Sequence, residues 1–200
     1  KEFSDETFKE FDEASKKSEL TKKIDDLISG KIVNKSESQS ALHPKYRSYS
    51  DAIKMPTHLA EAGVKAETFL NKSINTCTDK GYDTVNILTL GIGGSYEGPK
   101  LLLEAINNPI HNNKTELVKI SYDFITGSDP NEFEHKTQSL DPENTFFIVS
   151  SKSFTSDETI DSLKKAFAWS RNKKNFIAIT ANPDEVSKYD IEDIIFFDKE

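Results

Sequence analysis

From residue 84 onward, the chain alternates between short apolar runs and segments with helical spacing. The apolar runs, rich in Val, Ile and Phe, cover residues 84–90, 117–124, 145–150, 175–180 and 193–197. Such nearly continuous apolar runs are typical of parallel strands covered on both faces. The helical patterns fall at 97–107, 130–139, 156–171 and 183–189. This alternation predicts an α/β fold, a doubly wound five-stranded parallel sheet with the flavodoxin-like strand order 2-1-3-4-5.

The first 82 residues have helical patterns and no β-like run. Helical spacing covers residues 4–29 and ends at Gly30, and a longer pattern covers 57–80 and ends near Gly81. A short helix is expected at 36–44, interrupted near Pro44. We therefore expect residues 1–82 to form a helical extension that packs on a sheet domain at 83–200.

Composition excludes several classes of protein. The formal net charge of −8 argues against a nucleic-acid surface, and no apolar run approaches the roughly 20 residues that span a bilayer. Cys77 is the only cysteine, so the chain has no internal disulfide, which fits a reducing cytoplasm. The four histidines show no metal-ligand spacing. Because the first residue is Lys1 and the last ones follow directly on a strand-like run, we expect a piece of a longer protein.

Two loops rich in small residues each follow a predicted strand and open a predicted helix. They are Gly91–Ser95 and Ser151–Ser156. Free backbone N–H groups and the positive end of a helix dipole make such a junction an anion site. In the predicted strand order both loops lie at the crevice where ligands bind, so together they predict a site for one dianionic phosphate.

Taken alone, the first loop has other interpretations. The dinucleotide pattern G-x-G-x-x-G would require glycine at position 96, which is Tyr96, and no G-K-[ST] follows as in a P-loop. A nucleotide-binding domain is therefore disfavoured. A simple tight turn remains an alternative for this loop.

The second loop is richer in ligand groups. Ser151, Ser153, Thr155 and Ser156 offer hydroxyls and Lys152 offers a charge. The alternative is a capping box, in which Thr155 and Glu158 satisfy the first donors of the helix. The acidic pair Asp157–Glu158 is expected at a helix start from the dipole alone, so we do not interpret it as a catalytic pair.

At these residues the chain resembles the phosphoglucose isomerase family. The stretch from Leu90 to Pro99 resembles the family's I-G-I-G-G-S-D-L-G-P, and Ser151–Thr159 resembles S-K-T-F-T-T-x-E-T. The stretch from Asn34 to Arg47 is similar, more loosely, to N-x-T-E-x-R-A-V-L-H-x-A-L-R. All three occur in the family's order.

The resemblance implies a sugar-isomerase (SIS) type of sheet domain and assigns roles to individual residues. Gly94 and Ser95 would contact the sugar phosphate. Its phosphate would be bound by Ser151, Lys152, Ser153 and Ser156, with Thr155 offering a further hydroxyl beside them. His43 and Arg47 would have structural roles.

The chain also departs from the family pattern. Tyr96-Glu97 replaces Asp-Leu, which places a carboxylate near the phosphate loops, and Gln39 stands where the family has Arg. Pro44 and Lys45 depart in the third motif, and residues 48–82 match poorly. These differences bear on the choice of sugar phosphate.

The resemblance further implies a glucose-6-phosphate isomerase of glycolysis and gluconeogenesis, a cytoplasmic homodimer that needs no metal or cofactor. The family's catalytic glutamate, histidine, lysine and arginine belong to stretches absent from these 200 residues. We therefore expect no catalytic residue in this chain and no activity from it alone. The alternative is a non-catalytic SIS-type module that binds sugar phosphates and serves regulation.

Overall fold

The computed structural model describes residues 3–35, 38–41, 56–106 and 118–197. These residues form two compact units, one within Lys1–Pro56 and the other within Thr57–Asp198. Each unit is described by itself. The predicted short helix at 36–44 lies largely outside the described residues. The stretch 107–113, whose asparagines and proline are typical of a loop, lies wholly outside them.

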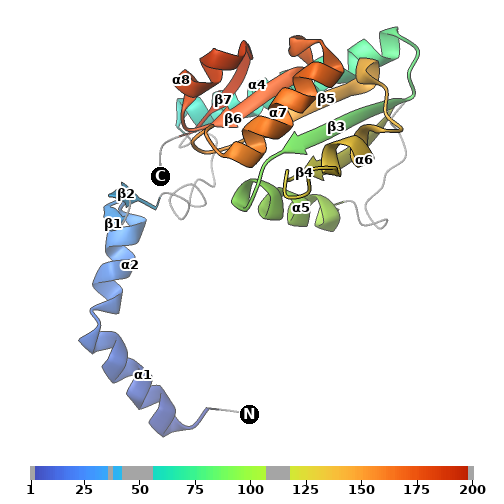
Figure 1. The fold of residues 1–200 in the computed structure, drawn as a ribbon. Helices are drawn as coiled ribbons and strands as arrows, with labels where there is room; N and C mark the ends of the chain where they lie inside the picture. Colours follow the sequence, from blue (N-terminus) through green and yellow to red (C-terminus); the bar gives the residue numbers. More distant parts are fainter. Residues whose placement is uncertain (1–2, 36–37, 42–55, 107–117, 198–200) are drawn as a thin grey trace. The chain divides into compact units, whose positions relative to one another are not determined.

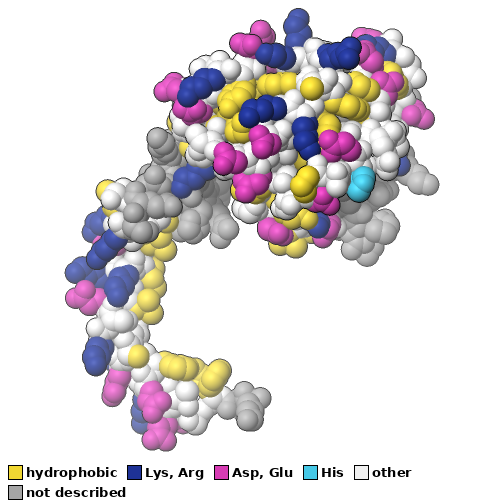
Figure 2. All heavy atoms as spheres, viewed as in Figure 1, with side chains coloured by type: hydrophobic (Ala, Val, Ile, Leu, Met, Phe, Trp, Pro, Cys, Tyr) yellow, Lys and Arg dark blue, Asp and Glu magenta, His cyan; other side chains and the backbone are white. Residues whose placement is uncertain are grey.

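The first unit begins with two amphipathic helices, α1 (Asp5–Lys17) and α2 (Leu20–Ile28). Ser4 caps α1, its hydroxyl oxygen accepting a hydrogen bond from the Thr7 N–H at 3.2 Å. After α2, Gly30 takes a positive φ of 77°, as predicted for a helix stop. Neither helix buries a side chain, and their apolar residues line one exposed side (Figure 2).

A small antiparallel ribbon follows these helices, where no strand was expected. Strand β1 (Ile32–Asn34) pairs with β2 (Gln39–Ser40), with an irregular register between them. The Ser40 hydroxyl also donates to the Gly30 carbonyl oxygen at 2.8 Å. The prediction of helix at positions 39 and 40 was therefore wrong.

The second unit is built on the predicted five-stranded parallel sheet (Figure 1). Its strands are β3 (Thr84–Leu90), β4 (Lys119–Ile125), β5 (Thr145–Ser150), β6 (Phe176–Thr180) and β7 (Asp193–Phe196). They lie in the order β4-β3-β5-β6-β7, which is the predicted 2-1-3-4-5. The chain order therefore reverses between β3 and β5.

Helices connect the strands and cover both faces of this sheet. They are α4 (Thr57–Asp79), α5 (Gly94–Ile106), α6 (Glu132–Thr137), α7 (Asp157–Ser170) and α8 (Pro183–Val186). Single 3₁₀ turns occur at η2 (Pro142–Asn144), η3 (Lys173–Asn175) and η4 (Ser187–Tyr189). Among the described residues, no helix is long and apolar enough to cross a membrane.

Alternating side chains of the strands divide the core into two layers. On one face, Leu88 and Val149 pack with Leu163 of α7 and Phe133 of α6. On the other face, Val85, Ile87 and Phe146 pack with residues of α4. Successive side chains of a strand thus enter opposite layers, and both layers are buried, as a sheet covered on both faces requires.

Helix α4 belongs to the sheet unit and not to a separate extension. Phe69 and Cys77 of α4 are buried against the sheet, and the Phe69 ring meets Phe146 edge-on at 6.1 Å. The compact unit that contains the sheet accordingly runs from Thr57 to Asp198.

Candidate phosphate-binding site

The two predicted loops leave the sheet side by side. Strands β3 and β5 are parallel neighbours, and Leu90 lies opposite Val149 at their carboxyl ends. The loop after β3 and the loop after β5 therefore start at the same edge of the sheet, where the chain order reverses (Figure 1). Ligands of doubly wound sheets bind at this kind of crevice.

Gly91, the first residue after β3, is packed tightly against the end of β5. Its N–H continues the ladder by donating to the Ile125 carbonyl oxygen at 3.1 Å. A Cβ added at Gly91 would lie 2.8 Å from the Ser150 carbonyl oxygen and 2.9 Å from the Ser95 Cβ. Only a residue without a side chain fits at this point.

Helix α5 begins three residues earlier than its apolar spacing predicted. It starts at Gly94, so Gly94 and Ser95 lie in its first turn. Gly93, directly before it, has a φ of +52°, and its carbonyl oxygen accepts the N–H of Glu97 at 2.9 Å. The Ser95 N–H donates to the Ile92 carbonyl oxygen and the Tyr96 N–H to that of Gly93, both at 3.0 Å. The donors that this end of α5 could offer to an anion are therefore the Gly94 N–H and the Ser95 hydroxyl.

The second loop is anchored to the neighbouring strand β6. The N–H of Ser151 donates to the Ile179 carbonyl oxygen at 3.0 Å, and the Lys152 carbonyl oxygen accepts the Ala181 N–H at 3.1 Å. The Thr180 hydroxyl also donates to the Lys152 carbonyl oxygen, at 3.1 Å. The backbone of this loop is thus fixed on one side by a third strand.

Phe154 fixes the middle of the second loop. Its backbone is left-handed, with a φ of 57°, although it is not glycine. The ring is only 1% exposed and packs 5.8 Å from the Tyr189 ring. A bulky residue adopts such a conformation when its surroundings determine it, and here burial of the ring does so.

Hydroxyls of the predicted site shape the same loop. The buried Ser151 Oγ accepts the Phe154 N–H at 3.1 Å. The exposed Ser153 Oγ accepts both the Thr155 N–H at 3.3 Å and the Thr155 hydroxyl at 2.8 Å. Since a serine oxygen that accepts still has its own proton to donate, these bonds leave both serines able to donate to an anion.

The capping box proposed for Thr155 and Glu158 is not formed. Helix α7 begins at Asp157, so Ser156 is the N-cap, and its side chain makes no capping hydrogen bond. The Thr155 hydroxyl donates to Ser153 instead of capping the helix. The first-turn N–H groups of α7 therefore lack a cap from Ser156, which favours an anion site over a simple helix start.

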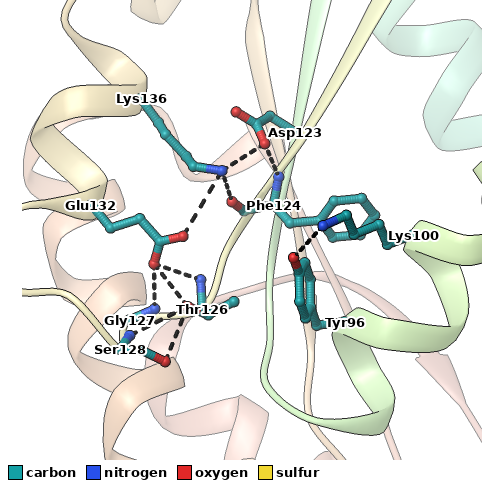
Figure 3. A network of polar contacts seen from close by, with 9 residues as sticks. All are labelled: Tyr96, Lys100, Asp123, Phe124, Thr126, Gly127, Ser128, Glu132 and Lys136. Carbon is teal, nitrogen blue, oxygen red and sulfur yellow. Dashed lines mark hydrogen bonds and ion pairs between the residues drawn. The ribbon is translucent and has the colours of Figure 1, made fainter. Parts of the chain in front are cut away.

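The Tyr96 side chain, at a position where the family motif has Asp, packs toward β4 and not toward the second loop. The Tyr96 ring packs edge-on against Phe124 at the end of β4, with 5.4 Å between the ring centroids (Figure 3). The Tyr96 hydroxyl oxygen accepts a hydrogen bond from Lys100 Nζ at 2.7 Å. That hydrogen bond raises the pKa of Lys100. The Glu97 side chain is exposed. Tyr96 thus serves the packing between α5 and β4.

Sequence reasoning missed the contribution of the loop after β6. Asn182 Nδ2 donates to the Ser153 carbonyl oxygen at 3.2 Å, and the Asn182 N–H donates to the Thr180 hydroxyl oxygen at 3.0 Å. An asparagine two residues after the end of an apolar strand was the available signal. His43 and Arg47 of the third motif lie outside the described residues.

The described parts of the chain hold no group of three or more His, Cys, Asp or Glu side chains arranged to bind a metal ion. Within the two loops the donors are hydroxyls, backbone N–H groups and one lysine, and the exposed carboxylates of Asp157 and Glu158 follow in the first turn of α7. This is a donor set for an oxyanion.

Comparisons with known proteins show the family of the chain. A sequence model described as phosphoglucose isomerase matches residues 1–199. The chain is 33% identical over 189 residues to a glucose-6-phosphate isomerase of Legionella pneumophila (strain Lens), covering 88% of this chain and 36% of that relative. It is 30% identical to a glucose-6-phosphate isomerase of Wigglesworthia glossinidia brevipalpis, with 93% of this chain and 36% of the relative covered.

Among solved structures, a glucose-6-phosphate isomerase from Chlamydia trachomatis D/UW-3/Cx has a similar fold. The TM-score is 0.66 at 20% identity, with 98% of this chain and 39% of that chain covered. The chain thus spans a little over a third of the length of the relatives it matches.

Proposed function

The chain belongs to the phosphoglucose isomerase family, and from this premise we propose that the complete protein interconverts glucose 6-phosphate and fructose 6-phosphate. The observation that carries the proposal is the pair of donor-rich loops at adjoining ends of β3 and β5. One phosphate between them would receive donors from the Gly94 N–H and the Ser95 hydroxyl at the start of α5 and from the first turn of α7. The role of these 200 residues is then to bind the phosphate of the substrate.

The residues proposed to contact the sugar phosphate come from both loops. They are Gly94, Ser95, Ser151, Lys152, Ser153, Thr155 and Ser156. The hydroxyls and backbone N–H groups would surround the phosphate oxygens, and Lys152 would contribute a full positive charge. This charge matters because Asp157 and Glu158, both exposed, stand in the first turn of α7 and repel an anion.

Binding at the phosphate would serve catalysis at the other end of the sugar. An aldose–ketose isomerisation moves a proton between C1 and C2 through an enediol, far from the phosphate. Binding energy gained on the remote phosphate holds C1 and C2 against the base and so lowers the barrier. The catalytic groups that the family resemblance implies are not among these residues, so the chain alone would bind and not isomerise.

The same proposal implies a pathway, a compartment and an oligomeric state for the complete protein. The protein would act in glycolysis and gluconeogenesis, in the cytoplasm, as a homodimer. The single cysteine, Cys77, is buried and free, which is compatible with a reducing compartment.

Two measurements test the proposal. The first is the thermal shift of this chain with fructose 6-phosphate, 6-phosphogluconate, inorganic phosphate and ATP, because a ligand that binds only the folded state raises its apparent stability. We expect a shift with the sugar phosphates that is lost in Ser153→Ala. Ser187→Ala is the matched control, since Ser187 is also exposed and donates only to the Asp184 carbonyl oxygen.

The second measurement is isomerase activity of the full-length protein in an assay that couples glucose 6-phosphate to a dehydrogenase. Activity that falls in Ser153→Ala and persists in Ser187→Ala supports the proposal. Sugar-phosphate binding without isomerase activity would identify a non-catalytic module, and binding of ATP alone would contradict both interpretations.

A further inference from the structure

A carboxylate closes the loop that follows β4. Glu132 lies at the start of α6, and its Oε2 accepts three hydrogen bonds (Figure 3). The donors are the Thr126 N–H at 2.9 Å, the Gly127 N–H at 2.8 Å and the Thr126 hydroxyl at 3.0 Å. The Glu132 side chain is only 16% exposed. One oxygen atom therefore satisfies three donors and fixes the conformation of this turn.

A lysine joins the same carboxylate to the end of β4. Lys136 Nζ contacts the Asp123 carboxylate at 2.6 Å, the Phe124 carbonyl oxygen at 2.5 Å and the Glu132 Oε1 at 3.9 Å (Figure 3). Asp123 in turn accepts the Phe124 N–H at 2.7 Å. Helix α6 and the carboxyl end of β4 are thus held together by one charged network.

The turn that Glu132 closes touches the first turns of α7. Gly127 has a φ of +73°, and a Cβ added there would lie 2.7 Å from the Glu158 carbonyl oxygen and 2.9 Å from the Ser162 Oγ. The backbone of the loop is therefore in direct contact with the backbone of α7. A second tie comes from Lys165 of α7, whose Nζ donates to the Pro130 carbonyl oxygen at 2.6 Å.

The part of α7 that this loop supports is the amino end of the helix, where the second phosphate loop joins it. Glu158 lies two residues after Ser156, the N-cap without a capping bond. We infer that Glu132 is a positioning residue for the phosphate site, acting through Gly127 on the first turn of α7. This inference rests on the proposed function, because it concerns the same site.

Loss of the carboxylate should weaken phosphate binding without touching the ligand. In Glu132→Ala the N–H groups of Thr126 and Gly127 lose their acceptor, so the turn and the end of α7 relax. Because misplacement of binding groups by about 1 Å costs up to about a hundredfold, we expect the KM for fructose 6-phosphate to rise about tenfold or more. The fall in kcat should be smaller than the fall in kcat/KM, since no reacting group has changed.

The experiment compares four variants of the full-length protein. Glu132→Ala and Gly127→Ala should raise KM for fructose 6-phosphate and the Kd for inorganic phosphate together. Glu132→Gln keeps an oxygen that accepts from the loop and should recover most of the affinity. Glu143→Ala is the matched control, because Glu143 pairs with Lys80 on the exposed surface at the amino end of β5.

Three outcomes separate a positioning role of Glu132 from a purely structural one, and separate this inference from the proposed function. Parallel losses of affinity in Glu132→Ala and Gly127→Ala, at a temperature where both are folded by circular dichroism, support the inference. If both variants lose stability and yet bind phosphate as Glu143→Ala does, Glu132 only stabilises the fold and the inference is overturned, while the proposed function stands. If the unmodified protein binds no sugar phosphate, the proposed function fails and the inference falls with it.

Discussion

Replacing Gly91 by alanine tests whether the two phosphate loops are held as closely as described. The added Cβ would lie 2.8 Å from the Ser150 carbonyl oxygen and 2.9 Å from the Ser95 Cβ, closer than real Cβ atoms approach. The nearer of these atoms belongs to the backbone of a central strand, so it cannot yield by a rotamer change. The loop after β3 must move away from the loop after β5.

The loss of stability caused by this movement follows from the known effect of overpacking a protein interior. Extra methyl groups forced into a packed position destabilise a protein by about 1–3 kcal/mol. With a urea m-value of about 2 kcal/mol/M for a domain of this size, the unfolding midpoint should fall by about 0.5–1.5 M. Trp169 is a suitable fluorescence probe, because its ring packs edge-on against Phe133 and Phe147 in the core.

Gly94→Ala is the informative comparison. A Cβ at Gly94 would meet no atom within 4 Å, and Gly94 stands at the start of α5. Alanine is favoured over glycine in a helix by up to about 1 kcal/mol, so stability should hold or rise. Phosphate affinity should nevertheless fall, because the methyl group occupies space that we assign to the ligand.

The two variants thus separate packing from binding. Gly91→Ala should lose both stability and phosphate affinity, and Gly94→Ala should lose affinity alone. An unchanged urea midpoint and unchanged phosphate binding in Gly91→Ala would refute the close approach of the loops on which the site depends.

Three further predictions concern other parts of the sheet unit. Tyr82 donates to the Asp141 carboxylate at 2.6 Å, a bond that lowers the pKa of Asp141 and raises that of Tyr82 to about 12. The stability it confers is present above the ordinary aspartate pKa of about 3.9 and is lost as pH falls through the lowered value; it is lost again as pH rises from about 10 to about 12. The urea midpoints of the unmodified chain and Tyr82→Phe should therefore differ at pH 7 and converge at both extremes, and a constant difference would contradict the assignment. Cys77 is fully buried and burial raises its pKa, so labelling by a thiol reagent at pH 8 should follow the rate of unfolding and not the rate of a surface thiol. Phe154→Ala should cost about 3–5 kcal/mol in urea unfolding and abolish phosphate binding, because the buried ring supports the left-handed turn; retained binding would show that the turn is held by other contacts.

The sheet could be predicted from the sequence because its strands are long, apolar and separated by helices. The run 145–150 has the predicted bounds, and 84–90 does as well. The strand order is the one known for flavodoxin-like doubly wound folds, which the alternation of strands and helices indicated. The start of α5 was predicted too late because Gly93 and Gly94 carry no apolar signal, although the helix begins at Gly94.

Other features depend on contacts that no local pattern records. The ribbon of β1 and β2 has strands of three and two residues, too short for a period-2 alternation to be visible. Thr155 and Glu158 have the spacing of a capping box, but the Ser153 oxygen competes for the Thr155 hydroxyl and the helix begins one residue later. The bracing of α7 through Gly127 joins positions that only the folded chain brings together.

The all-parallel sheet also sets the speed at which this unit folds. Thr84 pairs with Lys119 and Asn86 pairs with Thr145, both in parallel, so no two strands can pair before a whole crossover has been organised. Sheets made only of such distant pairings fold slowly, because the entropy of closing long loops is lost before any pairing compensates it. Strand β3 pairs with both β4 and β5, so the rate should depend on how soon this one strand finds its two partners. The phosphate loops begin only after β3 ends at Leu90 and β5 ends at Ser150, outside this pairing. Substitutions that loosen the loops should then leave the folding rate unchanged and speed unfolding.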